Sequence, residues 1–179
     1  MSAPLTPQPE VWMRGPIVGV PPLLQPVAHA LMQAAEEVTR YMADFDDALL
    51  WVRPGGRASV GFHLQHIRGV IDRLFTYAQE QQLSEQQLDY LRAEGKDDSA
   101  IHSAVLVKGF VRQVEEAVVL LKQVDESALT DVRYLGRKRI PTTLIGLLFH
   151  AAEHTQRHVG QLLVTVKLLP FFNANSDNH

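Results

Sequence analysis

The sequence predicts an all-α protein folded as a four-helix bundle. Apolar residues recur with the 3.6-residue period of an α-helix over four long stretches. Proline, glycine or polar residues separate these stretches, while Asn-Gly hairpin turns are absent and runs of β-branched residues are scarce. A chain of 179 residues is long enough to bury one full hydrophobic core. We therefore expect a single bundle domain over residues 22–169.

The two ends of the chain are expected to lie outside this domain. Residues 1–21 contain prolines at intervals that exclude a regular helix, which predicts an extended, proline-rich arm packed on the body or on a partner. Pro170 is expected to stop the last helix, because proline cannot donate the backbone hydrogen bond that continues it. Residues 170–179 are then predicted to form a flexible tail.

The first two long helices are predicted from apolar periodicity and from the break between them. Helical spacing runs from Pro22 to about Phe45, and it resumes from residue 60 to residue 78. The segment Arg53–Gly56, of sequence RPGG, interrupts the pattern and predicts a turn. The sequence thus predicts two helices joined by a short loop.

A short connector and two more long helices follow. Ser84 with Gln87 three residues later forms a capping box, which predicts a short helix reaching about residue 93. Asp98 or Ser99 is expected to cap the third long helix, which runs to about residue 124. After a polar loop, the fourth long helix is expected to open at residues 141–143 and to continue to Pro170.

Composition excludes several classes of function. The formal net charge of −3 and the lack of a long basic run give no reason to expect nucleic-acid binding. Neither a signal peptide nor a membrane span is apparent, so we expect a cytoplasmic protein. The chain has no cysteine, which excludes disulfides and thiolate ligands. Any bound metal must therefore be held by nitrogen and oxygen.

Five histidines on two of the predicted helices suggest a metal site. His150, His154 and His158 are spaced four apart, which places them on one face of the fourth helix. Residues eight apart lie roughly 12 Å apart along a helix, so spacing favours either the first two or the last two as a ligand pair. A third ligand is expected from His63 or His66 on the second helix, and periodicity does not distinguish them. The alternative is that these histidines are core or surface residues satisfied by hydrogen bonds.

Two established metal motifs do not fit. His150, Glu153 and His154 spell the H-x-x-E-H pattern of inverted zinc proteases, but no glutamate follows His154, and the one later aspartate is Asp177 near the end of the chain. A di-iron carboxylate bundle needs Glu-x-x-His on two helices. That tetrapeptide does not occur in this sequence.

The stretches Ser59–Ile67 and Glu153–Leu162, read as S-V-x-x-H-L-x-H-I and E-H-x-x-x-H-x-G-Q-L, resemble the DinB-like and YfiT-like family of metal-binding bundles. The resemblance implies an up-down-down-up bundle, often dimeric, that binds zinc, nickel or a similar divalent ion. It also implies that the metal ligands are His66, His154 and His158, with His63 and His150 as neighbours. Three protein ligands would leave coordination positions open for water or substrate.

The family includes transferases that use low-molecular-weight thiols and proteins described as metal-dependent hydrolases. From this resemblance we expect a metal-dependent thiol S-transferase of unknown substrate, acting as a homodimer, with hydrolysis as the alternative. A non-catalytic, metal-stabilised binding or stress-response protein is a further alternative, which a fourth ligand from His63 or His150 would favour. No general base is evident, since Glu153 is placed to pair with Arg157.

Four further residues are candidates for the surroundings of the site. Gln161 is a candidate for hydrogen bonding to a ligand or a substrate, and an interhelical polar contact is its alternative role. Phe62 could line the mouth of the pocket or pack in the core. Arg133 and Arg137 belong to a basic loop that could clamp the carboxylate of a thiol cosubstrate or simply be solvated.

Overall fold

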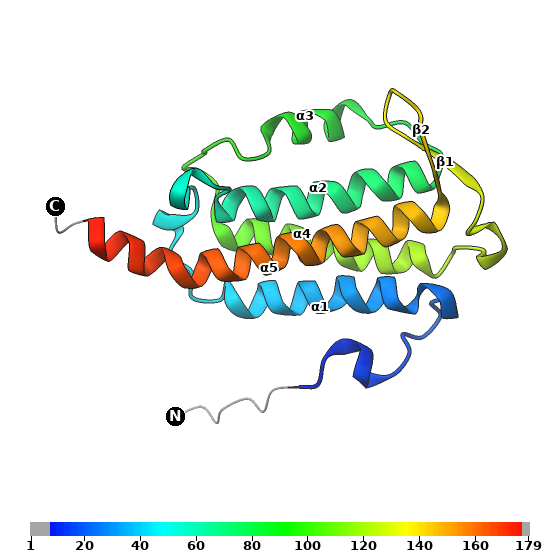
Figure 1. Ribbon diagram of the computed structural model, residues 1–179, viewed down its shortest axis with the longest axis horizontal. Helices are drawn as coiled ribbons and strands as arrows, with labels where there is room; N and C mark the ends of the chain where they lie inside the picture. The colour runs from blue at the N-terminus through cyan, green and yellow to red at the C-terminus, as the bar shows by residue number, and fades with distance from the viewer. Residues whose placement is uncertain (1–7, 177–179) are drawn as a thin grey trace.

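The computed structural model describes residues 8–176, in which five α-helices account for most of the chain. Four long helices lie side by side, and α3 lies outside them against α2 (Figure 1). This arrangement confirms the predicted all-α bundle with a short connector helix. The bounds are α1 Gln25–Tyr41, α2 Val60–Ala78, α3 Glu85–Ala93, α4 Ser103–Leu121 and α5 Leu144–Ser176.

The helices follow the up-down-down-up order. In Figure 1, α1 and α5 run in one direction, while α2 and α4 both run in the opposite direction. The parallel pair arises because the connector that holds α3 returns the chain along the bundle before α4 begins. Each of α1 and α2 packs against both α4 and α5. The helices that carry the histidine pairs, α2 and α5, are therefore antiparallel neighbours.

The core lies between these four helices and is apolar. Phe110 of α4 is fully buried, together with leucine and isoleucine side chains from the other three helices. Burying one such side chain stabilises the fold by about 1.5–3 kcal/mol. The largest contributors include Leu31, Leu64, Ile67, Ile71, Leu121, Leu148 and Leu162.

Side-chain caps set the starts of α2 and α3, whereas the start of α4 differs from its prediction. Ser59 accepts a hydrogen bond from the backbone of Phe62, and the capping box at Ser84 is present as predicted. However, α4 begins at Ser103 rather than after Asp98 or Ser99. The reason is a tertiary contact, because Asp47 from the loop after α1 accepts a hydrogen bond from the backbone N–H of Ser103 at 2.8 Å. A carboxylate at this place satisfies an otherwise unpaired N–H at the helix start.

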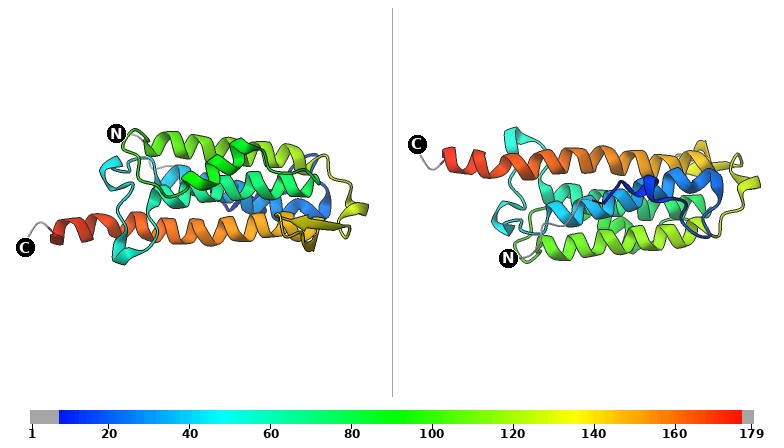
Figure 2. Two further views of the ribbon diagram at one scale, coloured as in Figure 1. Left: turned by 90° about the horizontal axis from the view of Figure 1, so that it is seen from above. Right: turned by 90° about the horizontal axis from the view of Figure 1, so that it is seen from below.

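The described part of the arm packs on the body. Val11 is buried, and its backbone N–H donates to Gln33 of α1 at 2.9 Å. Arg14 forms two hydrogen bonds with Glu36 at 2.7 and 2.8 Å. A single 3-10 turn, Val11–Arg14, interrupts the extended course that the prolines predict. Figure 2 shows the arm beside α1, on the side of the bundle opposite α3; residues 1–7 of the predicted arm lie outside the described residues.

A β-hairpin at one end of the bundle was not predicted. Strands β1 Val132–Leu135 and β2 Ile140–Thr143 pair antiparallel. The hairpin takes up residues 141–143, so α5 starts at Leu144 rather than at those positions. Thr143 still acts at the helix start, where its hydroxyl accepts a hydrogen bond from Gly146 N–H at 3.1 Å. The strands are only four residues long, too short for a clear period-two pattern.

The predicted helix end at Pro170 is wrong. Helix α5 continues through Pro170 to Ser176 and extends past the end of the bundle (Figure 1). Proline keeps a helical φ and removes one hydrogen bond, so a long helix can continue beyond it at a local cost. The predicted tail residues 177–179 lie outside the described residues. Over the described part of the chain, the helices are too short or too polar to cross a bilayer.

Candidate metal centre

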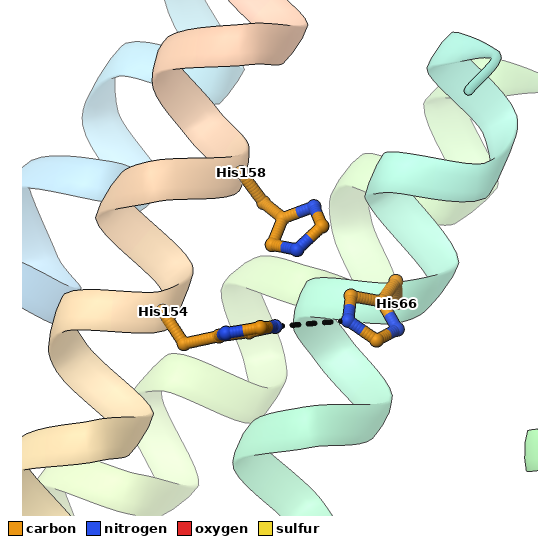
Figure 3. Close-up of side chains that lie close together, drawn as sticks. All are labelled: His66, His154 and His158. Atoms are coloured by element: carbon orange, nitrogen blue, oxygen red, sulfur yellow. Dashed lines mark hydrogen bonds between the residues drawn. The ribbon is translucent and has the colours of Figure 1, made fainter. Parts of the chain in front are cut away.

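The structure brings three of the predicted ligands together between α2 and α5. His66 projects from α2, and His154 and His158 project from successive turns of α5, so that the three rings face one another (Figure 3). Nε2 of His66 lies 3.0 Å from Nε2 of His154. One ligand nitrogen from each of the three residues lies within 4.8 Å of the other two.

These residues fit a divalent metal ion. Two nitrogens that bind one ion at about 2.0–2.1 Å are roughly 2.9–3.4 Å apart, depending on the angle at the metal. The 3.0 Å between His66 and His154 falls within that range. Within residues 8–176, Nδ1 of His154 is buried without a hydrogen-bond partner, so the polar contact of this ring runs through Nε2 toward His66. A donor set of three imidazoles suits zinc, nickel and related transition metals.

The surroundings favour the neutral form of His154 and His158, the two ligands on α5. Burial and the neighbouring His66 lower the pKa of His158 to about 3. Burial, again with His66, lowers the pKa of His63 to about 4. Burial and the adjacent His66 likewise lower the pKa of His154. Neutral imidazole carries the lone pair that binds a metal, so the site is prepared for a cation at neutral pH.

His63 and His150 are neighbours of the site, as the family resemblance implies. His63 is 3% exposed, and its Nδ1 lies 3.0 Å from Nδ1 of His158. This contact occupies one nitrogen of His158 and leaves Nε2 to face the other two ligands. His150 instead pairs with Glu153 at 2.6 Å, and Glu153 also contacts Arg157 at 3.4 Å. Together with His154, His150 and Glu153 make up a second, more exposed donor group.

Glu94 contributes to the site and was missed from the sequence. Its carboxylate accepts a hydrogen bond from Nδ1 of His66 at 2.8 Å and one from Arg73 at 2.6 Å. Glu94 directly follows α3, and only 5% of its side chain is exposed. A carboxylate behind a histidine ligand orients the ring and makes it a better donor. One sequence signal could have indicated it. Arg73, one turn after Gly69, is a cation on a largely apolar helix, and a buried cation needs an acidic partner.

The remaining candidates are placed differently. The ring of Phe62 stacks on that of His66, with centroids 5.0 Å apart, so it lines the site. Gln161 is exposed, and within the described residues its side chain forms no hydrogen bond with the histidines. Arg133 donates to the backbone oxygen of Ala78, twelve residues after His66 and roughly 18 Å further along α2.

Arg137 lies in the turn of the same hairpin, between β1 and β2. The predicted anion clamp of Arg133 and Arg137 therefore lies at the far end of the bundle, because the hairpin holds the basic loop there.

The fold and the site together place this chain in the class of metal-binding helical bundles, because histidines from two antiparallel helices converge between them. This chain belongs to the DinB superfamily, whose sequence pattern matches residues 30–162. No curated protein sequence matches it. YfiT from Bacillus subtilis, described as a probable metal-dependent hydrolase with an unusual four-helix bundle topology, has a similar structure. The TM-score is 0.61 at 12% identity, over 87% of this chain and 93% of that chain, which establishes a shared fold.

Proposed function

We propose that this protein is a metal-dependent enzyme in which His66, His154 and His158 hold a divalent ion, zinc or nickel. The observation that carries the proposal is the convergence of three imidazoles from α2 and α5, two of them 3.0 Å apart. The side chain of His66 is 20% exposed, so solvent reaches the centre. A site with three protein ligands and solvent access is typical of catalytic rather than structural metal centres.

An ion held in this way supplies a Lewis acid that lowers the pKa of a bound water or thiol. Hydrolysis is the first candidate reaction. It agrees with the description of the structurally similar YfiT, and it needs no anion clamp beside the metal. Phe62 forms an apolar wall against His66 on which part of a substrate could pack.

Thiol S-transfer is the second candidate. One observation favours it: the chain contains no cysteine, so a thiolate on the metal would come only from a cosubstrate. The position of Arg133 at the far end of α2 removes the expected clamp for the carboxylate of such a cosubstrate. Any recognition of a low-molecular-weight thiol would then depend on groups around Phe62 and the histidines.

A structural, non-catalytic metal site is disfavoured by the positions of the neighbouring histidines. Such a site would use a fourth protein ligand. His63 is instead directed at His158, and His150 at Glu153. Within the described residues, neither joins His66, His154 and His158 in one donor group.

The experiment is an activity screen of the full chain loaded with zinc or nickel. One arm offers activated esters and amides in water, and the other offers a small electrophile with cysteine or glutathione as thiol donor. The control is His29→Ala, because His29 lies on α1 and its ring contacts the backbone oxygen of Gly15 at 3.1 Å. Turnover that is lost in His158→Ala and kept in His29→Ala supports an enzyme, and the responding arm identifies the nucleophile. Absence of turnover in both arms, with metal bound, would favour a binding protein.

The homodimer and the cytoplasmic location complete the proposal. Analytical ultracentrifugation of the full chain tests the first, with a mass of about twice the 20.1 kDa monomer expected. Fractionation of cells that express the protein at its native level tests the second.

A further inference from the structure

We propose that Glu94 is a positioning residue of the metal centre: it fixes the tautomer and orientation of His66 and thereby couples the segment after α3 to metal binding. The proposal rests on the metal site proposed above and extends it to residues outside the two histidine helices. Glu94 comes from the connector between the second and third long helices, so one end of the site depends on a segment outside the four-helix core.

The hydrogen bonds define the role of each carboxylate oxygen. Arg73 donates to Oε1 of Glu94 at 2.6 Å, while Nδ1 of His66 lies 2.8 Å from Oε2. The side chains of Arg73 and Glu94 are only 10% and 5% exposed. An ionised carboxylate accepts hydrogen bonds and does not donate them, so Nδ1 of His66 carries the proton. The lone pair of His66 is then on Nε2, which faces His154.

Space for this carboxylate depends on a glycine. A Cβ at Gly69 would overlap Oε1 of Glu94 and would lie 2.5 Å from Nη1 of Arg73. Both atoms belong to the buried ion pair and have little room to retreat. Glycine in a helix interior costs about 1 kcal/mol relative to alanine. The close approach of Glu94 explains why α2 has a glycine at this position.

Other contacts bring the segment to this position. The backbone N–H of Gly95 donates to Oε1 of Gln65 at 2.7 Å, and the hydroxyl of Tyr90 donates to the backbone oxygen of Gln65 at 3.2 Å. Gln65 is buried on α2, next to His66 in the sequence. These bonds hold the segment without touching His66, so they allow docking of the segment to be separated from positioning of the imidazole.

The change Glu94→Gln tests positioning directly. In the variant, the amide oxygen is drawn to Arg73, which can only donate, and the NH₂ group faces His66. Nδ1 of His66 must then accept, and its proton moves to Nε2, from which it must be displaced before a metal can bind there. A residue that only anchored the segment would weaken its docking through the lost charge beside Arg73 but would leave the tautomer of His66 unchanged, whereas a positioning residue would change that tautomer.

The first measurement is zinc affinity of the full chain by competition with a chromophoric chelator. Glu94→Gln and Glu94→Ala should each bind zinc about 10–100-fold more weakly than wild type, the loss typical of residues that support a metal ligand. Glu85→Gln makes the same chemical change on α3 at a side chain that is 84% exposed, and it should stay within about threefold of wild type. Tyr90→Phe removes a docking contact only and should also stay within about threefold.

The second measurement separates failure of this proposal from failure of the metal site. Imidazole ¹⁵N NMR of the metal-free protein should show His66 protonated on Nδ1 in wild type and on Nε2 in Glu94→Gln. The same tautomer in both proteins, or zinc affinities within threefold of wild type for both Glu94 variants, would overturn the proposal. If wild type binds no zinc, the metal site itself fails, and the tautomer comparison still decides the role of Glu94.

Discussion

Acid should destabilise the metal-free protein through His63. This residue is 3% exposed, and burial together with His66 lowers its pKa from 6.5 to about 4. In the unfolded chain His63 takes up a proton near pH 6.5, whereas in the folded protein it stays neutral. Below that pH the unfolded state binds more protons, so the free energy of unfolding falls as the pH falls, down to the folded pKa of about 4.

The magnitude follows from the size of the shift. One pKa unit corresponds to about 1.4 kcal/mol, so the shift from 6.5 to about 4 amounts to about 3.5 kcal/mol when complete. Between about pH 7 and about pH 4.5, roughly 2 kcal/mol of this is lost. Typical domains have 5–15 kcal/mol of stability in total, so the effect is measurable by urea denaturation.

The matched variant is His63→Asn, which keeps a polar group near Nδ1 of His158 and removes the titrating imidazole. We expect it to lose about 2 kcal/mol less than wild type over the same pH interval. His102→Asn changes a largely exposed imidazole and should follow wild type. Equal acid losses in wild type and His63→Asn would refute the reasoning.

Three further predictions concern packing and the basic loop. Gly61→Ala would place a Cβ 2.6 Å from Cε3 of Trp51. We expect this change to lower the free energy of unfolding by about 1–3 kcal/mol in urea titrations. Any stabilisation would contradict the close packing of Gly61 against Trp51. Phe110→Ala empties a fully buried position and should cost about 3–5 kcal/mol in the same titrations; a loss below about 1 kcal/mol would contradict its place in the core. Arg133→Ala should leave zinc affinity within about threefold of wild type in chelator competition, because the side chain of Arg133 lies at the far end of α2. A tenfold loss of zinc affinity would instead mean that Arg133 contributes to the metal site.

Much of the fold could be predicted from local sequence signals. The apolar periods locate the long helices, and the capping box at Ser84 forms where it is expected. One error occurs where a tertiary contact overrides local preference: Asp47 from a distant loop sets the start of α4. The other is at Pro170, which removes one hydrogen bond from α5 without ending the helix.

The candidate site could also be predicted only in part. Spacing identifies His154 as common to both ligand pairs on α5, and the family resemblance distinguishes His66 from His63, which faces His158 instead. Glu94 could not be found from spacing, because it reaches His66 from 28 residues away through the fold of the connector. Of the two roles considered for the basic loop, a clamp at the site does not fit the structure, because the hairpin places Arg133 beside Ala78 at the far end of α2.

The central claim is that His66, His154 and His158 hold a divalent metal ion. It is tested most directly by metal content, measured by mass spectrometry on tag-free protein after dialysis against a weak chelator. We predict near-stoichiometric metal in wild type and in His150→Ala, and loss of metal in His66→Ala, His154→Ala and His158→Ala. Wild-type protein without metal, or metal lost only in His150→Ala, would contradict the account.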